Sequence, residues 1–205
     1  MNILTLDTAL NKSYIGLLYE EKEFYKTISS DDKNYHSAYL ARVLDDLFKD
    51  KELNNIDYLG INTGVGSFTG IRVGLSFAKI ITNRLNIKAI PLTTSEILNK
   101  AYDIKDIMLD ARRGSVFYTD SGCDMKLISY EEGLSVLEKK EKVISDNSLK
   151  TRFKSDKLFS FEEDNIDLSK FELELAKEKI KEGKYITSNE LKPNYIQTPP
   201  IYSKN

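Results

Sequence analysis

The stretch "GVGSFTGIRVGLSFAKII", from Gly64 to Ile81, restricts the possible folds of this chain more than any other segment. Glycines ahead of an apolar helix suggest a phosphate loop, but a P-loop requires Gly-Lys-Ser/Thr after four spacer residues, and no lysine of this stretch precedes Lys79. A dinucleotide fingerprint fails too, because its third glycine comes one place late, at Gly70, and no acidic residue ends the next strand. We therefore expect neither site.

The helix after this loop carries a row of small residues, Gly70, Gly74 and Ala78, which their spacing places on one face. A glycine inside a helix costs about 1 kcal/mol relative to alanine, so the row indicates that another backbone approaches closely. The other faces are apolar too, and carry Ile71, Val73, Leu75, Phe77, Ile80 and Ile81. Either the helix is buried in the fold, or one face awaits a partner. At its start Ser67 and Thr69 are typical capping residues, and a bound anion is the alternative.

The spacing of apolar residues along the chain predicts two successive sets of strands and helices in a similar order. The first set of strands and helices occupies residues 2–7, 13–19, 23–29, 36–49, 56–62, 70–85, 88–92 and 94–102. The second, looser set occupies residues 106–111, 115–120, 125–129, 129–140, 142–145, 147–153, 157–161 and 169–182. Ser129 and Glu132 form a capping box at the start of its first helix. We expect an α/β protein of two βββαβα-type halves, at 1–102 and 103–187, with an extended tail at 188–205.

Composition excludes several classes of function. The 30 basic and 32 acidic residues give no overall basic field to attract nucleic acid. The single cysteine, Cys123, excludes an internal disulfide and is interpreted as a surface thiol. Together with the single histidine, His36, it cannot form a Cys/His zinc site. The first residues have no basic flank and no long apolar run follows, so we expect no signal peptide, no membrane association and a cytoplasmic location.

Asp7, at the end of the first predicted strand and followed by Thr8, is a candidate for a chemical role. In a duplicated βββαβα fold this position faces the cleft between the halves, where an aspartate binds hydrated Mg²⁺ beside nucleotide phosphate. The favoured interpretation is an Asx turn that caps the hairpin, and the following "ALNKS" lacks the glycine of a phosphate hairpin. A hydrolase triad of Ser67, His36 and Asp7 can be drawn, but nothing in the sequence shows that the three meet.

Asp110, Arg112 and Arg113 cluster where a predicted strand meets a turn, in "LDARRGSVFY". An internal aspartate–arginine pair is the favoured interpretation. Contact with an anion or an RNA phosphate is the alternative. A metallopeptidase is excluded, because the chain has no second histidine for a His-x-x-x-His pair.

Several segments together resemble one family, the bacterial TsaB (YeaZ-type) proteins. The matching segments are "ILTLDTA", His36-Ser37 at a helix start, "GVGSFTGIRVGLSFAK", "PLTTSEIL", "LDARRGSVFY" and Pro193-Asn-Tyr195 in the tail. Two departures are Val65, where the family usually has proline, and Gln197, near a position where it tends to have arginine. The resemblance implies the actin/Hsp70/sugar-kinase-like (ASKHA) fold with a reduced second half, and a degenerate member without catalysis of its own.

The resemblance also implies a role in making N6-threonylcarbamoyladenosine at position 37 of tRNAs. The partner would be the catalytic subunit TsaD, which carries the metal and transfers the threonylcarbamoyl group, and the ATPase TsaE would join the complex. This chain alone would bind no cofactor, with ATP or ADP and metal held in the partner subunits, and it would reach tRNA only through the complex. Without TsaD it would self-associate. The interface residues implied are Gly70, Ile71, Gly74, Leu75 and Ala78, with Leu40, Leu44 and Leu47 nearby.

Two classes of function are therefore in competition. A non-catalytic scaffold subunit predicts that a bulky residue at Gly74 leaves the monomer folded and abolishes pairing with TsaD. In that case Asp7 and Thr8 would be the remnant of a nucleotide and Mg²⁺ site. The competing function is an ATP-dependent phosphotransferase or ATPase of the same fold, in which Asp7 lies near Mg²⁺. A peptidase that depends on Ser67 is a third alternative.

Overall fold

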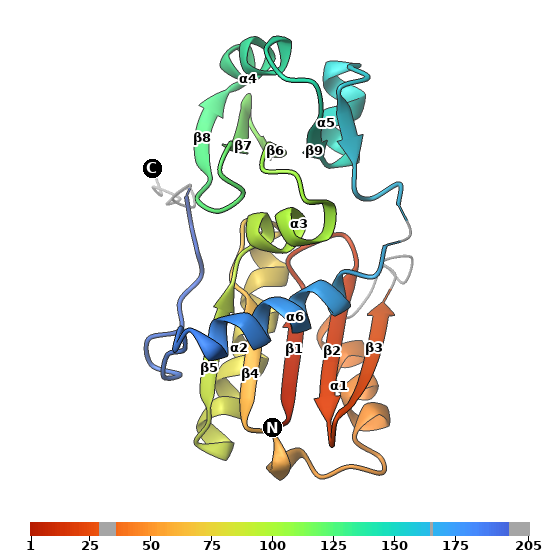
Figure 1. Ribbon diagram of the computed structural model, residues 1–205, viewed down its shortest axis with the longest axis vertical. Coiled ribbons are helices and arrows are strands. Elements are labelled where there is room, and N and C mark those ends of the chain that lie inside the picture. Colours follow the sequence, from red (N-terminus) through yellow and green to blue (C-terminus); the bar gives the residue numbers. More distant parts are fainter. Residues whose placement is uncertain (29–35, 165, 197–205) are drawn as a thin grey trace, which may run out of the picture.

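The computed structural model describes residues 1–28, 36–164 and 166–196, and for residues 36–39 the backbone alone. These parts form two five-stranded sheets, one above the other in Figure 1. Each sheet begins with a three-strand antiparallel meander and continues with two parallel strands, in the same spatial order. The α/β fold with two βββαβα-type halves is therefore confirmed.

The first sheet has the strand order β3-β2-β1-β4-β5. Its strands are β1 (Ile3–Asp7), β2 (Ser13–Tyr19), β3 (Lys22–Ile28), β4 (Tyr58–Asn62) and β5 (Lys88–Leu92). Because side chains alternate along a strand, Leu4 and Leu6 face one side of the sheet, whereas Ile3, Thr5 and Asp7 face the other.

Helices cover both sides of this sheet. They are α1 (His36–Leu47), α2 (Phe68–Leu85), α3 (Thr94–Tyr102) and α6 (Leu168–Lys181), with a short 3-10 helix η1 (Leu53–Asn55) that the sequence pattern did not predict. α1 and α2 lie behind the sheet in Figure 1, over Leu4 and Leu6, and α6 crosses in front, over Ile3. α3 lies at the end of the sheet that faces the second sheet. The first sheet is thus the middle layer of a three-layer structure.

The second sheet has the strand order β10-β9-β6-β7-β8. Its strands are β6 (Ile107–Arg112), β7 (Ser115–Thr119), β8 (Lys126–Ser129), β9 (Val143–Ser145) and β10 (Leu158–Ser160), and its helices are α4 (Tyr130–Glu138) and α5 (Asn147–Phe153). The predicted capping box is confirmed, since Ser129 Oγ accepts from Glu132 N while Glu132 Oε2 accepts from Ser129 N. A small core that includes Met108 and Leu149 joins α4 and α5 to the sheet.

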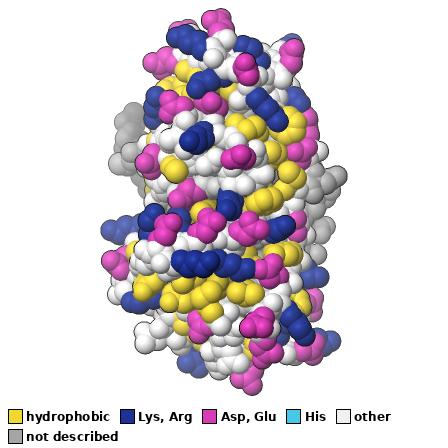
Figure 2. Space-filling view, in the orientation of Figure 1, with side chains coloured by type: hydrophobic (Ala, Val, Ile, Leu, Met, Phe, Trp, Pro, Cys, Tyr) yellow, Lys and Arg dark blue, Asp and Glu magenta, His cyan; other side chains and the backbone are white. Residues whose placement is uncertain are grey.

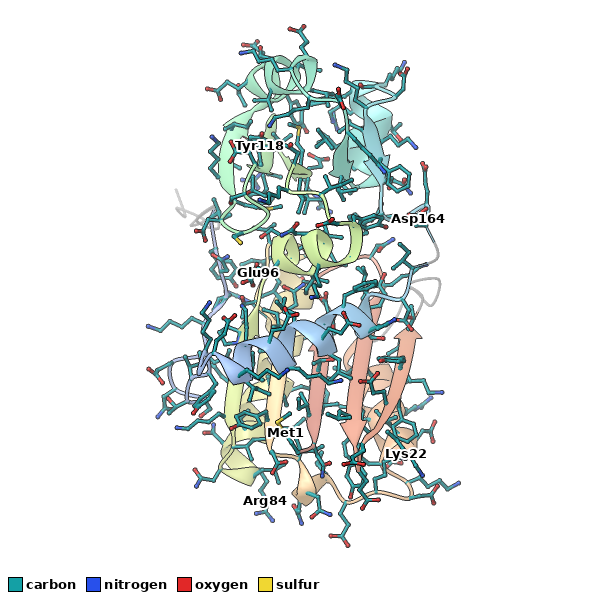
Figure 3. All side chains as sticks on the ribbon, viewed as in Figure 1. Met1, Lys22, Arg84, Glu96, Tyr118 and Asp164 are labelled. Atoms are coloured by element: carbon teal, nitrogen blue, oxygen red, sulfur yellow. The ribbon has the colours of Figure 1, made fainter. Side chains whose placement is uncertain are left out.

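Helix α6 departs from the expected division of the chain at 103–187. It follows the second sheet in sequence, yet its Leu173 and Ala176 pack on the first sheet, in one core with Ile3. The Lys179 Nζ atom lies 2.8 Å from Glu96 Oε2, and Figure 3 labels Glu96 at the level of α3. By packing, α6 is therefore part of the first half, because without it the front of the first sheet would expose apolar side chains.

The described part of the tail runs along the first half. Ile186 bridges Ala89 of β5, Leu191 is fully buried, and the N–H of Asn194 donates to the Thr63 carbonyl at 2.8 Å. Residues 188–196 form no helix or strand, and Gln197 lies outside the described residues.

Acidic and basic side chains are interspersed over the face of the molecule shown in Figure 2. This face has no extended basic field of the kind that attracts nucleic acid. Cys123 is exposed, as expected for a surface thiol. No helix in the described ranges is long and apolar enough to cross a membrane.

Candidate functional site

Two residues of the small-residue row on α2, Gly70 and Gly74, face the chain's own β1–β2 turn. A Cβ atom on Gly70 would lie 1.8 Å from the Thr8 carbonyl oxygen, and one on Gly74 would lie 2.5 Å from Thr8 Oγ1. The Thr8 hydroxyl fills the remaining space and donates to the Gly70 carbonyl at 2.7 Å. Glycine is therefore needed at both positions so that the turn after β1 can pack against the helix.

This packing corrects the interface that the sequence suggested. Within the chain Gly70, Ile71, Gly74, Leu75 and Ala78 are all buried. Leu40 and Leu47 of α1 are buried in the same core, and Leu44 packs against it half-buried. A bulky residue at Gly74 would clash with Thr8 and Ile61 inside the monomer. The structure therefore argues against the expectation that it leaves the monomer folded, because the two glycines hold a neighbouring segment of the same chain.

The opposite face of α2 is apolar and exposed. Phe68 is 41% and Ile80 is 67% exposed, at the two ends of a shallow groove of about 380 Å³. The groove is lined by Phe68, Thr69, Arg72, Val73, Ser76, Phe77 and Ile80. Large apolar side chains at the surface of an otherwise packed helix indicate a contact surface. We call this set of residues the outer face of α2.

The tail borders the outer face at the N-terminal end of α2. The Tyr195 ring stacks on the Phe68 ring with centroids 5.4 Å apart, and Arg72 Nε donates to the Tyr195 hydroxyl at 3.1 Å. The Arg72 guanidinium also lies 4.0 Å from the centre of the Phe68 ring. These contacts hold Phe68 in place, so the groove has a fixed shape at this end.

The glycine loop ahead of α2 is used for helix capping. Ser67 is the N-cap residue of α2, and its Oγ accepts from the N–H of Gly70 at 3.2 Å. The helix accordingly begins at Phe68, two residues before the predicted start. In the drawn triad the Ser67 hydroxyl is occupied by this cap, Asp7 is fully buried, and the His36 side chain lies outside the described residues. The described residues therefore bring no triad together.

Asp7 forms the Asx turn that the sequence favoured. Its Oδ1 accepts from Ala9 N at 2.6 Å, and its Oδ2 accepts from Asn62 Nδ2 at 2.8 Å. Burial raises the pKa of Asp7 to about 6, although both hydrogen bonds oppose the shift. Asp7 is fully buried, with Glu172 of α6 beside it.

The buried position of Asp7 corrects the expectation that it faces an open cleft. Helix α6 covers it with the Glu172 carboxyl beside it, and Asp7 and Thr8 are both buried, which leaves no open space for a hydrated cation and a phosphate. In the described part of the chain no group of three or more acidic, histidine or cysteine side chains could hold a metal ion. Asp7 and Thr8 therefore do not fit a nucleotide and Mg²⁺ site. The sequence did not single out Glu172, although it lies on the same helix stripe as Leu168 and Ala176.

Asp110 does not pair with the neighbouring guanidinium groups. It accepts from the backbone N–H of Arg112 at 2.8 Å, and also from the hydroxyls of Tyr130 and Ser148. Arg112 and Arg113 are exposed, have left-handed backbone φ values of 62° and 52°, and form no ion pair with any described residue. The internal-pair interpretation is therefore wrong, and the anion or RNA contact stays a prediction.

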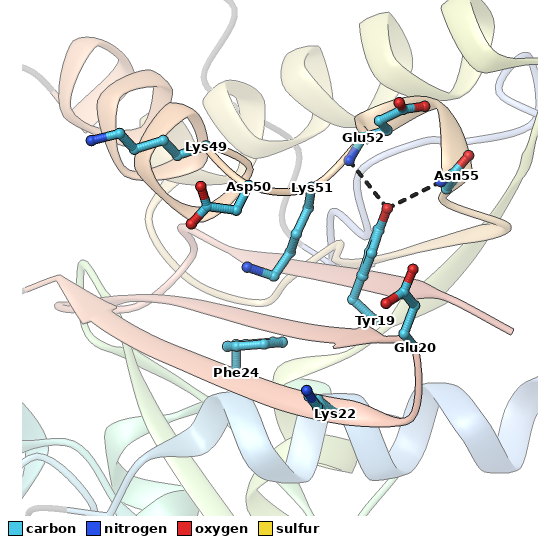
Figure 4. A pocket seen from close by; sticks show the side chains of 9 residues that line it. All are labelled: Tyr19, Glu20, Lys22, Phe24, Lys49, Asp50, Lys51, Glu52 and Asn55. Atoms are coloured by element: carbon cyan, nitrogen blue, oxygen red, sulfur yellow. Dashed lines mark hydrogen bonds between the residues drawn. The ribbon is translucent and has the colours of Figure 1, made fainter.

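A larger pocket, of about 610 Å³, lies between the β2–β3 hairpin and the segment after α1 (Figure 4). Its charged lining residues are Glu20, Lys22, Lys49, Asp50, Lys51 and Glu52. The Tyr19 hydroxyl accepts from Glu52 N and Asn55 Nδ2, both at 3.1 Å, and Lys51 Nζ lies 4.3 Å from the Phe24 ring centre. Because its acidic and basic side chains balance, the pocket favours no ligand of one charge.

Comparison with known proteins identifies relatives of this chain. A family model described as "TsaD: tRNA N6-adenosine threonylcarbamoyltransferase" matches residues 28–153, more than half of the chain. The tRNA threonylcarbamoyladenosine biosynthesis protein TsaB of Buchnera aphidicola subsp. Baizongia pistaciae is 30% identical over 104 residues, which are 50% of this chain and 46% of that protein. The TsaB protein of Haemophilus influenzae is 24% identical, over 58% of this chain and 53% of that protein. The chain thus spans about half the length of these two relatives.

A longer match is found with TsaB of Bacillus subtilis, which is 29% identical over 73% of this chain and 62% of that protein. Two solved structures share the fold. YeaZ from Pseudomonas aeruginosa has a TM-score of 0.74, with 16% identity over 95% of this chain and 99% of that chain. A structure described as an uncharacterized protein with similarity to peptidase YEAZ, also from Pseudomonas aeruginosa, has a TM-score of 0.77, with 16% identity over 96% and 99%. The chain has the ASKHA-type fold and belongs to the family of the TsaD model, in its TsaB (YeaZ-type) branch.

Proposed function

We propose that this chain is a non-catalytic subunit of the machinery that forms N6-threonylcarbamoyladenosine in tRNA, and that it binds a TsaD-type catalytic subunit through the outer face of α2. The names of the TsaB relatives support the pathway. The exposure of Phe68 and Ile80 on α2 is the observation that supports the binding surface.

The outer face has the properties of a helix-docking surface. Phe68, Arg72, Ser76 and Ile80 follow one another at intervals of four residues, which forms a continuous strip along the helix. Fully burying an exposed isoleucine side chain contributes about 1.5–3 kcal/mol. Covering the 67% exposed Ile80 would therefore contribute to the binding energy, and the 41% exposed Phe68 would add a smaller part. Arg72 and aromatic side chains are typical of the residues that dominate such interfaces. A partner helix with an apolar stripe fits this surface.

The proposal assigns the chemistry to the partner. Asp7, the residue that would bind a nucleotide-associated cation in an active member of the fold, lies under α6 beside a second carboxyl group. ATP or ADP, the metal and the TsaE-type ATPase would therefore act with the TsaD-type subunit, and tRNA would be reached through the complex. Without that subunit a second copy of this chain would occupy the same outer face.

An Ile80→Arg variant tests the surface. We expect the wild-type chain and its cognate TsaD-type subunit to elute as one complex whose mass is measured by light scattering after size exclusion. The variant should bind at least about tenfold more weakly, because a charge is placed in an apolar contact. Leu134→Arg, which alters a 44% exposed leucine of α4, is the matched control and should bind normally.

Normal binding by a folded Ile80→Arg chain would contradict the proposed surface. Binding of ATP and Mg²⁺ by the isolated chain, measured by calorimetry at millimolar nucleotide and lost in Asp7→Ala, would contradict the non-catalytic role and favour the phosphotransferase or ATPase.

A further inference from the structure

Glu172 of α6 is a fully buried carboxyl group that lacks a hydrogen-bond donor. Neither Oε1 nor Oε2 has a partner among the described residues, and the side chain lies in contact with Asp7 of β1. An ionised carboxylate in this position would lose its hydration without compensation, at a cost that buried charges in proteins rarely bear unpaired.

The packing of α6 prevents Glu172 from turning toward water. The helix lies close to the sheet, and a glycine in β2 permits this approach. A Cβ atom on Gly16 of β2 would lie 2.9 Å from the Ser169 carbonyl oxygen. Ser169, Glu172, Leu173 and Ala176 therefore form the buried stripe of α6, pressed against β1 and its neighbours.

The groups around the two carboxyls supply no positive charge. The titratable neighbours of Glu172 are Asp7 on β1, Tyr14 on β2 and Asp167, the residue before α6. Tyr102 of α3 lies near enough to Tyr14 to influence its pKa, and Asn62 of β4, which donates to Asp7, is neutral. Among the described residues, no lysine or arginine interacts electrostatically with the Asp7 or Glu172 carboxyl group. A second negative charge on this pair would therefore have no neighbouring positive charge to balance it.

The hydrogen bonds distinguish the two carboxyl groups. Both oxygens of Asp7 already accept N–H bonds, from Ala9 and Asn62, which stabilise its ionised form. Glu172 receives none, so its protonated form is favoured. A protonated Glu172 would have an O–H to donate to the neighbouring Asp7 carboxylate. A carboxylic acid bonded to a carboxylate satisfies both groups with one negative charge.

We propose that Asp7 and Glu172 hold one proton between them at neutral pH, and that this acid–carboxylate pair fastens α6 to the first sheet and makes the fold more stable in mild acid than in mild alkali. The proposal is independent of the partner-binding function. The two groups titrate as a coupled pair, so the property belongs to the pair.

The direction of the pH effect follows from proton binding. Burial raises the pKa of Asp7 to about 6 and raises the pKa of Glu172 well above its ordinary value. The native chain therefore keeps protons that the unfolded chain releases above about pH 4. The free energy of unfolding falls as the pH rises from there through the raised pKa values, opposite to the behaviour of a carboxylate in a salt bridge.

The test compares wild type with Glu172→Gln, whose amide donates to Asp7 but cannot ionise. Urea unfolding is followed by circular dichroism between pH 5 and pH 8, and calorimetry in buffers of different ionisation enthalpy counts protons released on unfolding at pH 7. Wild type should lose stability with rising pH relative to Glu172→Gln and should release about one proton more. Glu174→Gln, a half-buried glutamate of the same helix, should behave as wild type.

Equal pH dependence and equal proton release in wild type and Glu172→Gln would overturn the proposal. If Glu172→Gln does not fold, the carboxyl carbons of the wild-type chain are titrated by nuclear magnetic resonance. A Glu172 that stays protonated at pH 6 in the native chain supports the shared proton, and one that is ionised at pH 5 refutes it.

Discussion

The two faces of α2 differ in both residue size and partner. The inner face has Gly70, Gly74 and Ala78, and it is filled by the chain's own Thr8 turn and first sheet. The outer face carries Phe68 and Ile80, which stay exposed. The small residues of α2 therefore allow another segment of the same chain to approach the helix closely. The exposed large apolar residues indicate a surface that is available to another protein.

Gly70→Ala should have the largest effect, on the inner face. Its Cβ would lie 1.8 Å from the Thr8 carbonyl oxygen, a backbone atom that cannot rotate away. We expect a loss of about 3 kcal/mol or more in the free energy of unfolding, measured by urea denaturation, despite the better helix propensity of alanine. Ser76→Ala, on the outer face of the same helix, is the control and should not destabilise the chain. A Gly70→Ala chain as stable as wild type would show that the inner packing is looser than described.

Thr8→Val should have an intermediate effect. The change keeps the shape of the side chain but removes the hydroxyl that donates to the Gly70 carbonyl at 2.7 Å in a buried place. We expect about 1–3 kcal/mol less stability in the same denaturation experiment, because the carbonyl loses its buried partner. Thr69→Val, at an exposed position of the outer face, should differ little from wild type. Equal losses at both positions would remove the distinction between the faces.

Ile80→Arg should have the smallest effect on folding. The side chain is 67% exposed, and surface substitutions of this kind change stability by about 0.5 kcal/mol or less. Its denaturation midpoint should match that of wild type, which separates loss of binding from loss of fold. A large drop in the midpoint would place Ile80 in the core of the monomer and count against an outer face that is free for a partner.

Much of this architecture could be predicted from the sequence, since strand and helix periodicities are local. The Asx turn at Asp7 and the cap at Ser67 were predictable as well, because each depends on one side chain and the backbone beside it. The face of α2 proposed to bind a partner could not be predicted from the sequence, because the helix is apolar on nearly every side. Only the tertiary position of Thr8 decides which side is filled.

Two other features depended on contacts that the sequence pattern does not contain. Glu172 lies on the apolar stripe of a highly charged helix. This position is the one feature of the sequence from which its burial could have been predicted. Its proximity to Asp7 comes from α6 returning to the first sheet. The expected Asp110–arginine pair failed because the turn directs the backbone N–H of Arg112, rather than its guanidinium, to the carboxylate.

Thiol reactivity tests most directly whether the outer face of α2 is the surface that binds a TsaD-type subunit. A Ser76→Cys chain places a thiol in the groove, and the exposed Cys123 of the second half serves as an internal reference. Both are alkylated with and without an excess of the TsaD-type subunit, and mass spectrometry measures each rate. We predict that the partner slows labelling at position 76 at least tenfold and leaves labelling of Cys123 unchanged. Equal labelling at position 76 in a complex confirmed by light scattering would contradict this prediction.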